Sequence, residues 1–334
     1  MMRWVKRIAL GIGGLILVAL LAGISYEQIM RWRGPRDFPV AGRLVDVDGS
    51  RMQIDCRGSG SPTVVFDSGL DTMGSLSWSA VHDAIAATTR ACAYSRRGIV
   101  WSEPRTGQFT ADGEARDLHT LLANAGEHGP FVMVGHSLGG PYIMNFTRLY
   151  PQEVAGLVFV DASHPDQIER MNRAVGKKLN TGDKLLKFAN AITWTGVPRL
   201  IVTHGESGNV PAAAKRAQDA YISHSLASAL QEGEALDATF AAGGRLRDLG
   251  DRPIVVLTAM KPYPAEALKS LDLTVEQGRQ IQTVWKAMHD DEASWSHHSR
   301  HEVVPDSTHY IQFDRPDVVI SAVREVVGEV RSAS

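Results

Sequence analysis

The chain has 334 residues, enough for one large α/β domain with an insertion or for two ordinary domains. It carries 35 lysine and arginine residues and 37 aspartate and glutamate residues, spread without long runs, for a formal net charge of −2. This balance excludes the strongly basic surface of a nucleic-acid-binding protein, so we expect no nucleic-acid partner.

An apolar segment comes first in chain order. Residues 8–26 carry no charge and, at 1.5 Å rise per residue, span roughly one bilayer core. Three basic residues within residues 1–7 favour a cytoplasmic N-terminus. We therefore expect a single-pass transmembrane signal anchor, with the rest of the chain on the extracytoplasmic side of the membrane. The alternative is a cleaved signal peptide and a secreted protein, although residues 22–25 make a poor cleavage site.

Strands and helices alternate after a linker. Residues 27–42 combine charge with two prolines and indicate the linker. Apolar runs rich in β-branched residues and segments with helical spacing then follow one another. Strands are expected at 43–49, 51–58, 63–66, 90–95, 131–135, 154–160, 253–259 and 302–305, and helices at 78–89, 111–125, 141–150, 275–289 and 316–330.

This order predicts an α/β fold with a mostly parallel, eight-stranded sheet and helices on both faces. The core is expected to comprise residues 43–164 and 251–334. Residues 165–250 show helical patterns and interrupt the alternation. They predict a helical cap inserted after the sixth strand.

The stretch FVMVGHSLGG, residues 131–140, contains a candidate nucleophile. Ser137 follows a predicted buried strand, precedes a predicted helix and has a glycine two residues away on each side. A sharp strand-to-helix turn, the nucleophile elbow, needs small residues at these positions and exposes the serine hydroxyl. The alternative is a serine that only caps the helix.

A serine hydroxyl needs a base, and nucleophile-elbow enzymes carry their histidine after the last strand. His309 occupies that position. The histidines at 297, 298 and 301 lack carboxylates or cysteines at ligand spacing, so we expect a polar loop there and no metal site.

The third member is a carboxylate that orients the histidine. Asp161 ends the predicted strand 154–160, where its side chain would reach the same crevice as His309. Asp272, in the region after strand 253–259, is the alternative acid, and a plain capping role for Asp161 is the other reading.

Two backbone amides are candidates for the oxyanion hole. The N–H of Leu138 lies at the start of the helix after Ser137. The second donor should come from the loop after the third strand, where the N–H of Leu70 follows Gly69. An ordinary strand-end turn is the alternative for this loop.

Together these features resemble the α/β-hydrolase superfamily, in its serine esterase and lipase branch, over roughly residues 40–332. The matching stretches are FDSGLD at 66–71, AYSRRGIVWSE at 93–103, VMVGHSLGG at 132–140, FVDASHPDQ at 159–167 and STHYIQFDRPDVV at 307–319. An acid after the sixth strand resembles one known branch of this family, which includes pancreatic-type lipases. A serine nucleophile argues against haloalkane dehalogenases and epoxide hydrolases, which resemble this fold but use a carboxylate.

The resemblance makes the second and fourth strands neighbours. Cys56 and Cys92 could then lie side by side as a disulfide, which would agree with export. Buried reduced thiols are the alternative.

The sequence thus predicts a carboxylesterase that forms an acyl-enzyme on Ser137 and needs no cofactor, with a small-molecule ester as its substrate. An acyltransferase, amidase or peptidase could use the same triad. A noncatalytic binding protein of the same fold is a more remote alternative.

Overall fold

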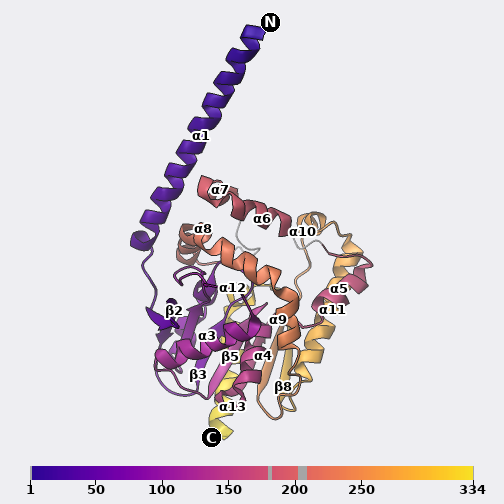
Figure 1. The fold of residues 1–334 in the computed structure, drawn as a ribbon. Helices are drawn as coiled ribbons and strands as arrows, with labels where there is room; N and C mark the ends of the chain where they lie inside the picture. Colours follow the sequence, from indigo (N-terminus) through magenta and orange to yellow (C-terminus); the bar gives the residue numbers. More distant parts are fainter. Residues whose placement is uncertain (1, 180–182, 202–208, 334) are drawn as a thin grey trace.

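The computed structural model describes residues 2–179, 183–201 and 209–333 (Figure 1). A central sheet has the strand order β1-β2-β4-β3-β5-β6-β7-β8. The strands are β1 (Arg43–Val47), β2 (Ser50–Arg57), β3 (Thr63–Asp67), β4 (Ala91–Ser95), β5 (Phe131–His136), β6 (Val154–Val160), β7 (Ile254–Ala259) and β8 (Ser299–Val304). β2 pairs antiparallel with β1 and β4, and all other neighbours are parallel. The prediction of a mostly parallel, eight-stranded sheet is confirmed.

The inner strands are buried on both faces because their apolar residues run without interruption, as in β3 (TVVFD) and β5 (FVMVGH). Successive side chains enter two different cores. Val65 and Met133 share one core with helices α3 (Ala111–Asn124) and α4 (Gly139–Leu149). The other face packs against α2 (His82–Ala86) and α13 (Pro316–Ala333).

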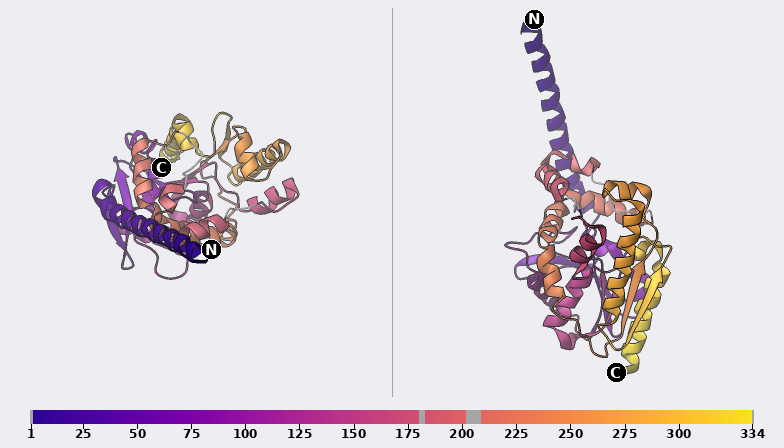
Figure 2. Two further views of the ribbon diagram at one scale, coloured as in Figure 1. Left: turned by 90° about the horizontal axis from the view of Figure 1, so that it is seen from above. Right: turned by 90° about the vertical axis from the view of Figure 1, so that its right-hand side faces the viewer.

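Helices fill the chain between β6 and β7, as expected of a cap (Figure 2). Helix α9 packs on α4, and α8 packs on η1, a short 3-10 helix at Gly74–Trp78. The cap elements are α5 (Gln167–Val175), α6 (Asp183–Ala191), η3 (Thr193–Thr195), α7 (Pro198–Ile201), α8 (Ala212–Glu234) and α9 (Leu236–Gly243).

The remaining elements follow the predicted order with different lengths. In place of a helix over 78–89, the chain forms η1 and the short α2. At the end of α2 the carbonyl of Ile85 accepts from the Thr88 hydroxyl at 2.9 Å and from the backbone N–H groups of Thr88 and Thr89, so the chain closes in a turn there. The other elements are η2 (Pro151–Glu153), α10 (Ala265–Ser270), α11 (Val275–Ala293) and α12 (Ile311–Asp314).

The N-terminal part of helix α1 (Met2–Asp37) projects away from the rest of the molecule (Figures 1 and 2), whereas its C-terminal part contacts η3 and α8. It is long and apolar enough to cross a membrane, and its apolar stretch is unburied. The helix also continues through most of residues 27–42, where the sequence predicts a linker. Ion pairs one helical turn apart, Glu27 with Arg31 and Arg33 with Asp37, support this extension.

Candidate active site

Ser137 lies in the turn between β5 and α4, at the carboxyl edge of the sheet. Its φ of 52° is in the left-handed region, which L-residues other than glycine seldom adopt. Such strain persists where the surrounding structure enforces it, and it is concentrated at functional sites. The turn therefore has the geometry of a nucleophile elbow.

The glycines around Ser137 are required by close backbone approaches. A Cβ on Gly135 would lie 2.6 Å from the carbonyl oxygen of Gly139. A Cβ on Gly139 would in turn collide with the carbonyl of Asp67, and one on Gly140 would lie 2.6 Å from the Cβ of Ala162. The spacing of glycines in the motif thus follows from packing between β5, α4 and the ends of β3 and β6.

Asp161 and His309 form a direct pair at the same edge. Asp161 follows β6, is almost fully buried, and accepts a hydrogen bond of 2.6 Å at Oδ2 from His309 Nδ1. Its other oxygen, Oδ1, accepts from the backbone N–H of Ala259 at 2.8 Å and from Nε1 of Trp285 at 2.9 Å. Burial opposes ionisation, but the hydrogen bond and charge of His309 outweigh it and hold the pKa of Asp161 below its usual value.

The alternative acid is elsewhere. Asp272 is exposed, pairs with Lys177 at 2.7 Å, and is not among the residues that line the cavity of Ser137 and His309. That ion pair lowers the pKa of Asp272. Of the two carboxylates, the one that contacts His309 is Asp161.

A cavity of about 560 Å³ brings the three predicted residues together. Ser137, Asp161 and His309 all line it, with Trp285 on α11 and Tyr310 beside His309. With its Nδ1 proton directed at Asp161, the imidazole of His309 has Nε2 as its basic nitrogen. The arrangement can activate a hydroxyl in a partly enclosed space.

The loop after β3, which contains Leu70, is held by a buried arginine that the sequence analysis did not assign. Arg96 donates to the carbonyls of Ser68 and Gly69, each at 2.7 Å. In a planar trans peptide the N–H points opposite to the C=O. Because the Gly69 carbonyl faces Arg96, the N–H of Leu70 points away from it. A Cβ on Gly69 would lie 2.9 Å from Ser137 Cβ, so this loop passes directly beside the serine.

Leu138 is the N-cap residue of α4, so its N–H belongs to the open first turn of that helix. The two candidate oxyanion donors therefore lie in two segments next to Ser137. Leu138 follows the serine directly, and Leu70 is in the loop after β3 that passes beside it.

Arg96 also connects the core to the cap. Its guanidinium is almost fully buried and pairs with Asp67 at 2.8 Å and with Glu232 of cap helix α8 at 2.7 Å. Burial raises the pKa of Asp67 to about 6, against the opposing charge of Arg96. The motif AYSRRGIVWSE contains this arginine, but its partner Glu232 is 136 residues away and no local pattern points to it.

His136, the residue before Ser137, fixes the loop of His309. Its Nε2 donates to the backbone carbonyl of His309 at 2.9 Å, and the two rings lie 4.7 Å apart. Burial and the neighbouring imidazole lower the pKa of His136 to about 3. His136 is therefore a neutral structural neighbour of the site.

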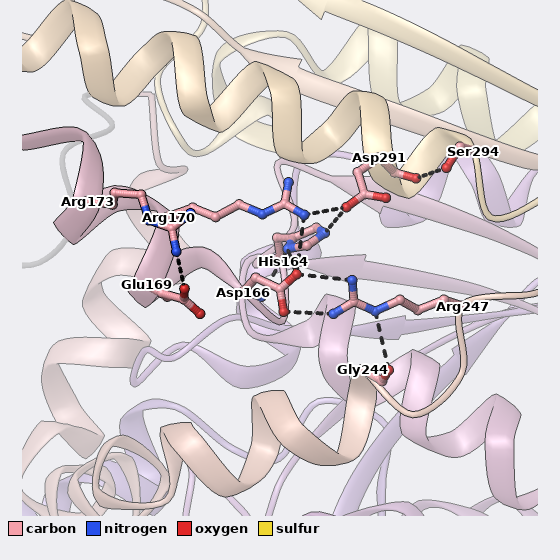
Figure 3. A network of polar contacts seen from close by, with 9 residues as sticks. All are labelled: His164, Asp166, Glu169, Arg170, Arg173, Gly244, Arg247, Asp291 and Ser294. Atoms are coloured by element: carbon pink, nitrogen blue, oxygen red, sulfur yellow. Dashed lines mark hydrogen bonds and ion pairs between the residues drawn. The ribbon is translucent and has the colours of Figure 1, made fainter.

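A second polar network lies just after Asp161 (Figure 3). His164, Asp166 and Asp291 bring possible metal-ligand atoms within 4.8 Å of one another. Arg247 pairs with Asp166 at 2.8 Å and Arg170 pairs with Asp291 at 2.7 Å, so two cations already balance these carboxylates. The network joins the start of the cap to α11 and holds the loop that follows Asp161.

The two cysteines face each other across neighbouring antiparallel strands. Cys56 on β2 is in register with Cys92 on β4, and a disulfide joins them. The bond lies in the sheet, away from the cavity residues.

Comparison with known proteins identifies the family. Residues 55–322, more than half of the chain, match the alpha/beta hydrolase family. Over 85 residues the chain is 35% identical to Lipase LipV of Mycobacterium tuberculosis, covering 25% of this chain and 31% of the lipase. Over 198 residues it is 23% identical to the uncharacterized protein YbdG of Bacillus subtilis, covering 59% of each. These matches span less than two thirds of each relative.

Solved structures agree in fold at low sequence identity. A thermophilic esterase from Thermogutta terrifontis has a TM-score of 0.55 and 22% identity, over 86% of this chain and 98% of that chain. Est816, described as an N-acyl homoserine lactone degrading enzyme, has a TM-score of 0.57 and 20% identity, over 85% and 99%. An epoxide hydrolase from Bacillus megaterium has a TM-score of 0.60 and 15% identity, over 86% and 100%. By its match over residues 55–322, the chain belongs to the alpha/beta hydrolase family.

Proposed function

We propose that the chain is a serine hydrolase that cleaves carboxylic esters through an acyl-enzyme on Ser137. The observation that carries this proposal is the 2.6 Å hydrogen bond from His309 Nδ1 to Asp161, at the wall of a cavity that Ser137 also lines. A buried carboxylate in this position holds the imidazole in the tautomer whose Nε2 accepts a proton, and it stabilises the imidazolium that forms.

In the first half of the reaction, Ser137 Oγ attacks the ester carbonyl while His309 Nε2 takes the serine proton. The oxyanion of the tetrahedral intermediate accepts hydrogen bonds from the N–H groups of Leu138 and Leu70. The carbon–oxygen bond to the alcohol then breaks, and the alcohol leaves with the proton from His309. Asp161 stays ionised throughout, in keeping with its lowered pKa.

In the second half, water attacks the acyl-enzyme by the same route. His309 takes a proton from the water, the second oxyanion collapses, and the carboxylic acid leaves as Ser137 recovers its proton. Each bond that forms is matched by one that breaks, and these steps need no cofactor.

The identity of the nucleophile favours esters over epoxides. Epoxide hydrolases are among the proteins with a similar fold, but enzymes of that kind use a carboxylate where this chain has Ser137. A serine forms an ester intermediate, which suits acyl transfer. The contact of Arg96 with the Gly69 carbonyl supports the Leu70 amide as a donor to an acyl oxyanion.

Turnover of a p-nitrophenyl ester series with acyl chains of increasing length tests this function. We expect the wild type to release p-nitrophenol and one equivalent of free acid, and Ser137→Ala to lose turnover while keeping the wild-type melting temperature. Equal turnover by both proteins would contradict the proposal. Formation of a new ester instead of free acid when an alcohol is added would identify an acyltransferase, and turnover restricted to anilides would identify an amidase.

We also propose that α1 is an uncleaved, single-pass membrane anchor with the catalytic domain outside the cytoplasm. Support comes from a contact that a discarded signal peptide would not need, because Gly23 packs directly on the Thr195 carbonyl. Next to it, fully buried Glu27 pairs with Arg199 at 2.6 Å and holds this end of α1 on the cap. The full chain should stay in the membrane pellet after alkaline carbonate extraction, and external protease should digest the domain on intact cells. A soluble product that begins near residue 26 would support secretion instead.

A further inference from the structure

The outer side of the cap exposes large apolar side chains. Helix α6 and the segment from η3 to α7 contribute them, and we call these five residues the cap apolar face: Leu186, Phe188, Trp194, Val197 and Leu200. Leu200 is 73% exposed and Phe188 is 58% exposed. Soluble monomers seldom leave such side chains together in water unless the surface has a partner. In Figure 1, α6 and α7 lie on the side of the cap from which α1 projects.

Two residues of the cap apolar face, Val197 and Leu200, adjoin the apolar part of α1. A cavity of about 570 Å³ lies between them, lined by Leu20 and Ile16 from α1 and by Val197 and Leu200 from the cap. Direct contact occurs at Gly23, where an added Cβ would collide with the Thr195 carbonyl. The two surfaces therefore run side by side, with no polar layer between them at these positions.

A buried ion pair fixes this arrangement. Glu27, one residue after the apolar stretch ends, pairs with Arg199 at 2.6 Å, and Arg199 also donates to the carbonyls of Asp219 and Ala220 in α8. Glu27 of α1 and Arg199 of α7 thus lie at one level. Val197 and Leu200 of the cap lie on the membrane side of that level, beside residues 16–23 of α1.

The contacts set a depth for the cap. At 1.5 Å per residue, Gly23 lies roughly 5 Å inside the apolar stretch that ends at Tyr26, and Leu20 lies roughly 9 Å inside it. A helix that spans the bilayer with residues 8–26 places both positions within hydrocarbon. Side chains that touch this part of α1 must then be at the same depth.

We propose that the cap apolar face is inserted in the outer leaflet of the bilayer that α1 spans, so that the cap is seated in lipid as well as tethered to it. This inference rests on the proposed anchor. Leu200 and Val197 contact acyl chains, and the indole of Trp194 lies at the interface, where its ring is both apolar and able to hydrogen bond. The enzyme would accordingly meet esters that are dissolved in the membrane.

Site-directed spin labelling of the full-length protein in phospholipid nanodiscs tests the seating. Labels are attached to cysteines introduced by Val197→Cys and Leu200→Cys. The two native cysteines do not react with the label because they are joined in a disulfide. The control is Val303→Cys on β8, since Val303 is 38% exposed and Val197 is 40% exposed. Oxygen concentrates in lipid, whereas a nickel chelate stays in water. We expect oxygen to relax the labels at 197 and 200 more than nickel does, and the reverse at 303.

A label at Leu15→Cys, within the apolar stretch of α1, distinguishes failure of the proposed membrane anchor from failure of the proposed cap insertion. If nickel dominates at 197 and 200 while the label at 15 is relaxed by oxygen, α1 is in the bilayer but the cap is not, and the inference is overturned alone. If nickel also dominates at 15, the anchor fails and the inference fails with it. Spin–spin broadening at 197 and 200 would show a second copy on the face and would likewise overturn it.

Discussion

Replacement of Asp161 by asparagine removes a charge without removing volume. The amide oxygen can take the place of Oδ1 and keep the hydrogen bonds from Ala259 and Trp285, at 2.8 Å and 2.9 Å. The amide NH₂ then faces His309 Nδ1, where Oδ2 now accepts at 2.6 Å. Two donors cannot face each other, so the imidazole must shift its proton to Nε2.

A histidine with its proton on Nε2 cannot accept the proton of Ser137. We therefore expect Asp161→Asn to lower kcat about 10⁴-fold, or about 5 kcal/mol of transition-state stabilisation, the scale found for the same change in other serine triads. KM should change little, because Asp161 lies behind His309 at the cavity wall. Steady-state hydrolysis of a p-nitrophenyl ester measures both constants.

The matched control is Asp272→Asn, the same chemical change at an exposed carboxylate that pairs only with Lys177 among its described side-chain contacts. Its kcat should equal that of the wild type. A loss below tenfold in Asp161→Asn, or a larger loss in Asp272→Asn, would refute the assignment. Thermal melts of both variants check that each is folded.

Three further predictions concern Trp285, Glu232 and His136. Trp285→Phe removes one hydrogen bond to the charged Asp161, so kcat should fall about tenfold with little change in KM, in initial-rate assays. Glu232→Gln leaves the buried Arg96 short of a partner, so urea unfolding should show a loss of about 3 kcal/mol. The pKa of His136 is about 3 in the folded protein and higher in the unfolded chain, so His136 binds a proton on unfolding at acidic pH. His136 should therefore lower the free energy of unfolding by about 3 kcal/mol as the pH drops from 6.5 to 4, and the total fall should be smaller by that amount in His136→Gln.

The sheet and the elbow could be predicted because their signals are local. A short, continuous apolar run such as FVMVGH, preceded by Gly129-Pro130, favours a strand buried on both faces, and the glycines at 135 and 139 are spaced for one tight turn. The position of Asp161 could be predicted for a related reason. Parallel strands end at the same edge of the sheet, so a residue that follows β6 lies at the edge where Ser137 follows β5.

The supporting contacts were not accessible from the sequence. Arg96 reaches Glu232 across 136 residues, and Trp285 reaches Asp161 across 124 residues, so only the folded chain brings them together. The extension of α1 was missed because two prolines and mixed charge are typical of linkers. Its helical state depends on tertiary partners such as Arg199, which the local pattern does not reveal.

We expect Ser137 to be the activated nucleophile of the site. Reaction of the full-length protein with a fluorophosphonate, followed by peptide mass spectrometry, tests it most directly, because the probe phosphonylates only serines that a nearby base activates. We predict one adduct, on the peptide that contains Ser137, absent in Ser137→Ala and strongly slowed in Asp161→Asn. A folded protein that carries no adduct, or carries it on another residue, would contradict the account.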